Sequence, residues 1–447
     1  VFDGCTSMSR IAVDNSSVKY TVKDGMLYEK NASGALVSLL YCPTNYPLAN
    51  DGKVVVPATV TKIADRLFYK NSNIKSFEVE GDINADIVFG NEVFNLCDEL
   101  ITVKLPKGLK KMTQKMFHEC AKLKEVNVPY TVTDIGKEAF SYCGALVNVT
   151  FDVDNDMPIE QRPVLTLGQK PFTYCASLTT LVLPERIKVL PKYLINYCSS
   201  LKEITIPESV TTLGSYLFYY SKAIEKITFV NDCPNVLEIP SSAFDGLVNI
   251  TSLKLPKNIT KISSMAFRNC AVKDLVIPAS VQSFHYQTFV GANKLETVVF
   301  EKNSQLKAIN GSAAFVFQNC TALRSITIPA NCTEIGVQVF VGCTSLTDVK
   351  FEEGSILNTI GSGAFSGCTS LTSIELPATI RTIQNDAFNN CTSLSSVTFK
   401  TYTKAQAEAA EKPEIEGKSS LCKIGVSFND TAISQFEFPI SVESSIE

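Results

Sequence analysis

The stretch FHECAKLKEVNVP, residues 117–129, decides the fold of this chain. Its framework consists of Phe117, Cys120, Leu123, Val126, Val128 and Pro129. The same framework returns about every 23 residues and is clear again from Phe388 onward. A fixed period of this length is typical of a solenoid, in which each unit buries its apolar face against its neighbours. We therefore expect function on a long repeated surface and not in a single catalytic pocket.

One large apolar anchor, Phe in every unit but one, marks each unit of the repeat. The anchors are Phe2, Phe68, Phe94, Phe117, Phe140, Phe172, Ile195, Phe218, Phe244, Phe267, Phe289, Phe317, Phe340, Phe365 and Phe388. Where the step between anchors exceeds 23 residues, polar segments have been added, and we expect them in loops at one rim. These segments are Asp152–Pro163, Val230–Val236, Glu301–Ser312 and Glu352–Ser355.

Each unit is predicted to contain a short strand followed by a turn. Residues 323–329 alternate inward aliphatic and outward polar side chains, which is the period of a half-buried strand, and Pro329 ends the strand. Residues 132–140 contain Gly136, which permits a turn, and then a run that suits one helical or 3₁₀ turn. We therefore predict an α/β but strand-rich solenoid, a right-handed superhelix of short parallel strands with 3₁₀ or short helical turns.

Two segments make the repeat specific enough to compare with a known family. Ile135-Gly136 with Ala139-Phe140 and Cys143, and the segment at residues 368–377, resemble the leucine-rich repeat of BspA-like surface proteins. The resemblance covers roughly residues 1–13 and 54–400, and residues 20–43 resemble an interruption common in that family. It implies a leucine-rich-repeat solenoid on a microbial surface that binds host matrix proteins or other cells. It supplies no binding motif that can be transferred to this chain.

The predicted organisation is one elongated repeat region with a closing segment. Residues 1–400 form the solenoid, interrupted at about 14–53, where Asp24-Gly25 suits a hairpin turn. Residues 401–447 depart from the repeat and are predicted to cap it, with a short helix and two strands; a binding module is the alternative. The chain begins with neither Met nor a signal-peptide pattern. We expect that material has been removed upstream, whether a signal peptide, further repeats or both, and that the protein is secreted or displayed on the cell surface.

Composition excludes two classes of partner. The net charge is −4 and no basic run with interleaved aromatics occurs, so nucleic acid is not an expected partner. No segment approaches about 18 uninterrupted apolar residues, so membrane insertion within this chain is not expected either.

The 15 cysteines raise the question of disulfides or zinc. Eleven occupy one slot of the repeat: Cys5, Cys97, Cys120, Cys143, Cys175, Cys198, Cys270, Cys320, Cys343, Cys368 and Cys391. Parallel side chains about 4.8 Å apart do not meet disulfide geometry, and no Cys-x₂-Cys pair is present. We therefore predict a ladder of buried free thiols that serve as small apolar groups. The pairing of Cys42, Cys233, Cys332 and Cys422 stays open.

No catalytic constellation, metal site or cofactor is expected. The two histidines, His118 and His285, fall at different places in their units, so no nucleophile, base and orienting group converge. Paired carboxylates for glycoside hydrolysis remain an open alternative. The run Asp152–Asp156 suits a calcium loop, but Met157 and Pro163 stand where an EF-hand requires Gly and Glu. We therefore predict that the protein is not an enzyme.

The outward strand positions, eight and ten residues after each anchor, form two polar columns. They contain Thr, Ser and charges of both signs, as at Glu125 and Asn127, and no aromatic residue. Tight interfaces usually carry Tyr, Trp or Arg anchors, and the chain has no Trp. The columns therefore favour weak, repeated contacts that gain strength through multivalency.

Aromatic residues gather instead in two consecutive units. The candidate binding residues are Tyr193, Tyr197, Tyr216, Tyr219 and Tyr220. Because the anchor Phe218 belongs to the same cluster, burial in the core is the competing interpretation. The loop at residues 152–163 is the second candidate contact.

The sequence thus favours a non-enzymatic surface-binding or adhesion protein. Its expected partner is a protein or glycan on a host or neighbouring cell. The alternative is a structural spacer whose functional module lies outside this chain.

Overall fold

The computed structural model describes most of the chain. The described residues are 5, 7–81, 86–154, 156–158, 161–310, 315–400, 423–424 and 435–436. They divide into two compact units, Val1–Asn235 and Val236–Glu447, which we describe separately.

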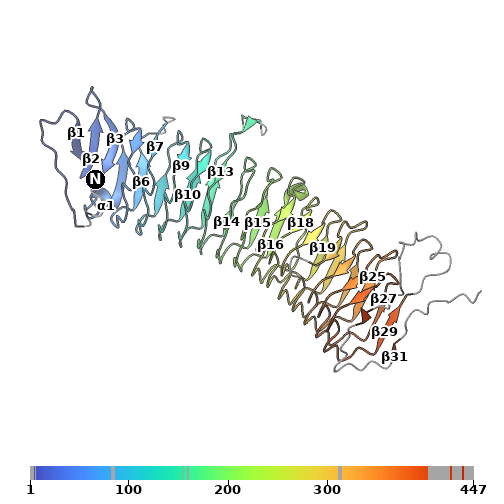
Figure 1. Cartoon of the computed structure of the whole chain (residues 1–447). Coiled ribbons are helices and arrows are strands. Elements are labelled where there is room, and N and C mark those ends of the chain that lie inside the picture. The colour runs from blue at the N-terminus through green and yellow to red at the C-terminus, as the bar shows by residue number, and fades with distance from the viewer. Residues whose placement is uncertain are drawn as a thin grey trace, which may run out of the picture. The chain divides into compact units, whose positions relative to one another are not determined.

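In both units the chain winds into coils whose strands pair in parallel. In the first unit β10 (Glu125–Val128) pairs with β12 (Asn148–Phe151), each residue opposite the one 23 positions later (Figure 1). Along β10 Val126 and Val128 are buried, while Glu125 and Asn127 are exposed. The predicted alternation is therefore confirmed, and the outward columns lie on the sheet face.

The first unit carries two sets of strands, one of mostly three or four residues and one of two residues. The longer set is β4 (Lys53–Val56), β6 (Ser76–Val79), β8 (Thr102–Lys104), β10, β12, β14 (Thr180–Leu181), β15 (Glu203–Ile206) and β16 (Lys226–Phe229). The two-residue set is β5 (Lys62–Ile63), β7 (Val88–Phe89), β9 (Lys111–Met112), β11 (Asp134–Ile135) and β13 (Thr166–Leu167). Strands β4 to β14 of the longer set form one six-stranded sheet, and β15 pairs with β16.

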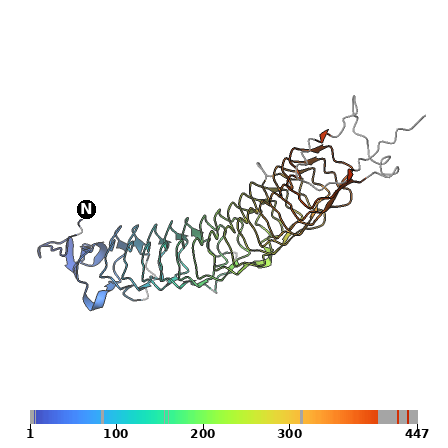
Figure 2. The ribbon, with the colours of Figure 1, turned by 90° about the horizontal axis from the view of Figure 1, so that it is seen from below.

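The second unit repeats this arrangement. Its longer set is β19 (Asp274–Ile277), β21 (Thr297–Phe300), β23 (Ser325–Ile328), β25 (Asp348–Phe351), β27 (Ser373–Leu376) and β29 (Ser396–Phe399). The short set is β17 (Glu238–Ile239), β18 (Lys261–Ile262), β20 (Ser283–Phe284), β22 (Ala308–Ile309), β24 (Glu334–Ile335), β26 (Thr359–Ile360) and β28 (Thr382–Ile383). In Figure 2 the coils of each unit follow one another side by side.

The predicted interruption contains an antiparallel hairpin. Strands β1 (Tyr20–Lys23) and β2 (Met26–Lys30) are joined through Asp24 and Gly25, whose φ angles are 49° and 74°. Two central residues with positive φ are the requirement of a type I′ turn, as Asp-Gly predicts. Strand β3 (Leu36–Tyr41) pairs with β2 and, in parallel, with β5, so it connects the hairpin to the coils.

The expected helical turns are wrong for the described residues, and with them the α/β label. Helical conformation in this part of the chain is confined to α1 (Ala49–Gly52), the 3₁₀ turn η2 (Val230–Asp232) and the single residue Gln161. Elsewhere the turn around each anchor places left-handed residues two positions before and two after it, such as Lys115 (φ 53°) and Glu119 (φ 57°) around Phe117. This conformation directs the N–H of Glu119 to the carbonyl of Ser141 in the next coil, 2.9 Å away. Bonds between coils therefore replace bonds within a helix.

Gly136, four residues before the anchor Phe140, has a different role from the one predicted. The φ of Gly136 is not positive. A Cβ there would instead lie 2.5 Å from the backbone nitrogen of Gln114 in the preceding coil. Glycine is needed at this position because two backbones approach closely.

The anchors form stacked ladders in the core, as predicted. Ring centroids of Phe94 and Phe117 are 5.3 Å apart in the first unit, and those of Phe317 and Phe340 are 5.4 Å apart in the second. Each anchor from Phe68 to Phe388 is buried, and Ile195 takes one place in the row. The predicted first anchor, Phe2, lies outside the described residues.

The thiol ladder is confirmed with one exception. The slot cysteines from Cys97 to Cys391 are buried and unpaired, but Cys5 is exposed. Cys42, Cys233 and Cys332 are also buried free thiols. Each slot thiol from Cys97 to Cys198 donates to a carbonyl one coil earlier, as Cys120 does to Phe94 at 3.0 Å. The side chain in this slot therefore makes a hydrogen bond as well as filling a small space, whereas the sequence analysis predicted only a small apolar group.

The predicted cap at residues 401–447 lies almost entirely outside the described residues. Two short strands in it are described, β30 (Lys423–Ile424) and β31 (Gln435–Phe436). They pair in parallel with β28 and β29 and so extend the two sheets of the second unit.

Candidate functional site: a tyrosine ridge on the first unit

Four tyrosines of the first unit occupy the same place in successive coils, two residues after the anchor. They are Tyr142, Tyr174, Tyr197 and Tyr220, with φ between 54° and 64°. Their ring centroids follow one another at 4.8, 4.7 and 5.7 Å, with planes tilted by 11°, 7° and 30°. The four rings thus form one continuous stack along the coils.

The five predicted binding residues lie together beside and within this stack. Tyr193 and Tyr216, two residues before their anchors, stack at 4.8 Å. Tyr219 stands edge-on between the two stacks, 5.9 Å from Tyr197 and 5.4 Å from Tyr216. The structure therefore brings the predicted residues into one cluster, and their role in binding remains a prediction.

Three members of the cluster escaped the sequence analysis. Tyr142 and Tyr174 extend the stack, and His118 lies against Tyr142 with ring centroids 5.5 Å apart. Counting two residues forward from each anchor would have found both tyrosines. We call the whole set the tyrosine ridge: His118, Tyr142, Tyr174, Tyr193, Tyr197, Tyr216, Tyr219 and Tyr220.

The tyrosine side chains of the ridge are partly exposed to solvent, and its histidine side chain is buried. The exposed fractions of Tyr142 and Tyr174 are 47% and 41%, whereas that of His118 is 8%. Burial lowers the pKa of His118, so the imidazole is neutral at pH 7. Burial also raises the pKa of Tyr142 and Tyr193, so their hydroxyls keep their protons and can donate.

Stacking determines which atoms of the ridge a partner meets. Rings tilted by only 7° to 12° at under 5 Å cover one another's faces, as between Tyr142, Tyr174 and Tyr197. The ridge therefore presents ring edges and phenolic hydroxyls, and not flat aromatic faces. Sugars stack on open faces, so this part of the ridge does not suit them.

At the position two residues after the anchor, the backbone of the first unit is strained in a way that the second unit avoids. In the first unit the residues two after the anchor are Lys70, Leu96, Glu119, Tyr142, Tyr174, Tyr197 and Tyr220. In the second unit they are Gly246, Asn269, Gly291, Asn319, Gly342, Gly367 and Asn390. All have positive φ, which costs roughly 1–2 kcal/mol for an ordinary residue and little for Gly or Asn. The fold therefore prefers Gly or Asn here, and the tyrosines are held against that preference.

Charged groups flank the ridge unevenly. Near its C-terminal end the ammonium groups of Lys170 and Lys222 lie 5.6 and 5.5 Å from the rings of Tyr193 and Tyr220. At its N-terminal end a carboxylate oxygen of Glu119 lies 3.7 Å from Nδ1 of His118. The two ends of the ridge therefore differ in charge.

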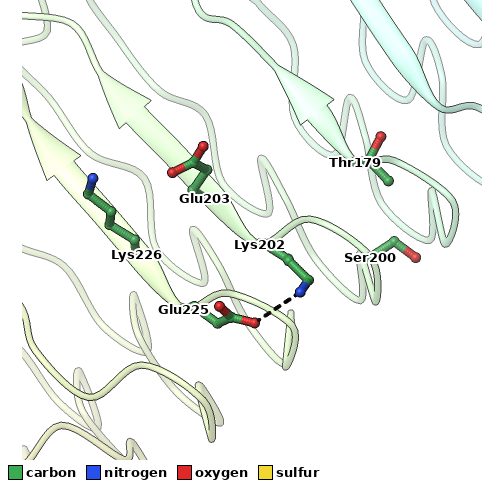
Figure 3. A pocket seen from close by; sticks show the side chains of 6 residues that line it. All are labelled: Thr179, Ser200, Lys202, Glu203, Glu225 and Lys226. Carbon is green, nitrogen blue, oxygen red and sulfur yellow. Dashed lines mark ion pairs between the residues drawn. The ribbon is translucent and has the colours of Figure 1, made fainter.

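A shallow hollow lies on the sheet face of the same unit. It encloses about 460 Å³ and is lined by Thr179, Ser200, Lys202, Glu203, Glu225 and Lys226 (Figure 3). Nζ of Lys202 lies 3.5 Å from a carboxylate oxygen of Glu225. Its charges are of both signs, and its lining contains neither His nor Cys.

The other candidate sites of the sequence analysis hold no convergent group. Asp152 accepts a bond from Nδ2 of Asn127 at 2.9 Å, and Asp154 accepts one from the N–H of Asp156 at 3.0 Å, while Asn155 lies outside the described residues. Among the residues that the structure describes, no three His, Cys, Asp or Glu side chains are grouped to hold a metal. In the same residues no helix is long and apolar enough to cross a membrane.

Comparisons with known proteins agree with this architecture. The family model described as BspA type leucine rich repeat region, in six copies, matches residues 50–161, 155–236, 233–315 and 311–445. No curated protein matches the chain. A leucine-rich repeat protein from Bacteroides ovatus of known structure aligns with a TM-score of 0.56 and 22% identity, over 87% of this chain and 89% of its own. That likeness shows the fold.

Two further solved structures align less closely. A leucine rich cell surface protein from Faecalibacterium prausnitzii shares 20% identity over 89% of this chain and 98% of its own, with a TM-score of 0.40. The pneumococcal vaccine antigen PcpA shares 17% identity over 97% of this chain and 91% of its own, with a TM-score of 0.43.

Proposed function

We propose that this chain, which belongs to the BspA-type leucine-rich repeat family, is a non-enzymatic binding or adhesion protein, secreted or displayed at the cell surface, that makes contact through its tyrosine ridge. A repeat solenoid fits a role in protein interaction, and the family resemblance supports the surface location. Tyrosine is also the residue type that most often anchors protein interfaces.

The strained backbone of the ridge is the observation that carries this proposal. Both units bury the same anchors and thiols, so the core does not require tyrosine two residues after the anchor. The second unit holds Gly or Asn at every equivalent described position. Strain that is retained without benefit to the core points to a role in contact with another molecule.

The spacer alternative draws support from the second unit. Its Gly and Asn at the equivalent positions offer a partner no large side chain there, such as at Gly342 and Gly367. We propose that this unit mainly extends the molecule and that binding belongs to the first unit. The mixed charges of the sheet face add weak contacts that become useful when many copies are displayed.

Binding to immobilised protein tests the proposal. The full chain is immobilised at high and low density and exposed to host matrix proteins and glycans. We expect binding that increases steeply with density and that falls at least tenfold in the double variant Tyr174→Gly/Tyr197→Gly, which copies the residues of the second unit. The control Thr327→Ala, on an exposed position of β23, should bind as the original chain does.

Two outcomes contradict the proposal. Equal binding by the ridge variant and the original chain would remove the ridge from the contact. A chain that binds no surface ligand at any density would favour the spacer.

A further inference from the structure

We propose that the partner of the tyrosine ridge is the same ridge on a second copy of this chain, joined in an antiparallel two-fold pair. The inference rests on the proposed function, because it identifies the partner of that surface. Three properties of the ridge support it: its spacing, its exposed chemistry and its charge.

The spacing of the ridge follows from the stacking of its coils. Successive rings lie 4.7 to 5.7 Å apart because neighbouring strands stack at about 4.8 Å. An extended peptide presents side chains to one side about every 6.6 Å, so after a few residues its side chains no longer lie opposite the rings of the ridge. A helix presents one face in unequal steps of three and four residues, about 4.5 and 6.0 Å along its axis, and so does not match an even row of rings. A second stack of coils has the same step as the ridge along its whole length.

The exposed atoms of the ridge complement a copy of themselves. A phenolic hydroxyl is both a donor and an acceptor, so two rows of hydroxyls can bond to each other. Ring edges carry partial positive charge, which the hydroxyl oxygens of a facing row can meet. The covered faces within the stack remove the main route by which a sugar would bind.

Charge selects the antiparallel orientation. Lys192 and Lys222 belong to the last two coils of the ridge. Lys170 belongs to the middle coil, and its ammonium group lies over the ring of Tyr193 in the next coil, as that of Lys222 lies over Tyr220. At the other end Glu138 is paired with Lys115 and Lys137, and Glu119 is next to the neutral His118. A parallel pair would place three lysines against three lysines. An antiparallel pair places Lys222 opposite Glu119, and a two-fold axis closes the assembly at two copies.

The pair should be weak. Seven partly exposed tyrosine side chains offer on the order of 500 Å², whereas stable complexes bury about 800 Å² on each partner. Self-association is therefore expected at high protein concentration, or between copies crowded on a surface.

Sedimentation equilibrium of the full chain over a wide concentration range tests this inference. We expect a reversible monomer–dimer equilibrium, weakened at least tenfold by Tyr174→Gly/Tyr197→Gly and unchanged by Thr327→Ala. Lys222→Glu and Glu119→Lys should each weaken the dimer several-fold, and the two together should restore it. Glu119→Lys is acceptable to the backbone because Lys70 already occupies the equivalent position with φ 59°. Circular dichroism and urea unfolding show that each variant is folded.

Each result decides a different question. A chain that stays monomeric at every concentration, or a dimer unaffected by the ridge variant, overturns the inference. If such a chain still binds a matrix protein or glycan through the ridge in the immobilised assay, the proposed function stands and only the partner is wrong. Failure of the charge exchange to restore the dimer overturns the antiparallel orientation.

Discussion

The two units build the same coil but treat one position differently. Both stack phenylalanines in the core, bury thiols in the same slot and bend the backbone into the left-handed region two residues after each anchor. At that position the second unit uses Gly or Asn, as at Gly342 and Asn319, and the first unit uses larger residues, as at Tyr174 and Tyr197.

The second unit therefore shows what the fold requires, and the first shows what has been added to it. A residue two after the anchor must send its N–H to the next coil, as Gly342 does to Ser366 and Tyr174 does to Asn196. Any residue that tolerates positive φ meets this need. Tyrosine adds a stacked, half-exposed ring that the coil does not need. The contrast separates stability from function, and the following predictions test it.

The largest expected effect is a loss of stability at alkaline pH in both units. Burial raises the pKa of Cys143 and Cys198 in the first unit, and of Cys270 and Cys391 in the second, to about 12. In the unfolded chain these thiols ionise near 9, so their stabilising contribution is complete below pH 9 and is lost as the pH rises toward 12. Each thiol should contribute about 1.4 kcal/mol per pH unit in that window.

Urea unfolding at pH 8, 9 and 10, followed by circular dichroism, measures this dependence. Replacing either Cys198 or Cys391 by Ser should reduce the dependence of the free energy of unfolding on pH by one proton. The slot accepts a hydroxyl, since Ser221 occupies it and donates to the carbonyl oxygen of Ile195 at 3.0 Å. A slope that Cys198→Ser leaves unchanged would show that the thiol ladder does not govern alkaline stability.

The next largest effect comes from the anchors and should be equal in the two units. Phe117→Ala and Phe340→Ala each remove a fully buried ring from a stack. Each should lower the free energy of unfolding by roughly 3–5 kcal/mol, measured by urea titration at pH 7. If only one of the two substitutions lowered the free energy of unfolding, the two units would not have equivalent cores.

A smaller effect, which differs between the two units, is expected two residues after the anchor. Tyr174→Gly loses two stacking contacts but relieves the left-handed strain, so the free energy of unfolding should change by less than about 1 kcal/mol. Gly342→Ala should lower it by about 1–2 kcal/mol, because φ is 73° and the new Cβ would meet Oδ1 of Asn319.

Tyrosine emission can follow both unfolding transitions, since the chain has no Trp. If Tyr174→Gly instead cost more than about 3 kcal/mol, the ridge would be structural and its role in binding would lose its main support.

The smallest effect is expected on the sheet face. Asn127→Ala in the first unit and Thr327→Ala in the second remove exposed side chains. Each should change the free energy of unfolding by less than about 0.5 kcal/mol in the same urea titrations. A loss comparable to that of Phe340→Ala would show that the assigned strand register is wrong.

Much of the fold was predictable from residue spacing, and part of the site was not. The alternation at Val126 and Val128 predicted the strand because side chains of a strand alternate between faces. The turns were misjudged because a Tyr such as Tyr142 ordinarily avoids positive φ, and only the bond to the next coil holds it there. Tyr142 and Tyr174 were not predicted as site residues because each is the only tyrosine near its anchor, so the sequence shows no cluster there.

The sequence by itself determined the repeat, the buried anchors and the thiol slot, because each depends on spacing within one coil and on the size of one side chain. Only the tertiary structure decided which residues adopt positive φ, which carbonyl each thiol meets and which rings stack. These features involve pairs of residues about 23 positions apart, such as Cys120 with Phe94 or Tyr174 with Tyr197, that meet only when coils are laid on one another. The ridge is therefore a property of the stack, although every tyrosine in it was visible in the sequence.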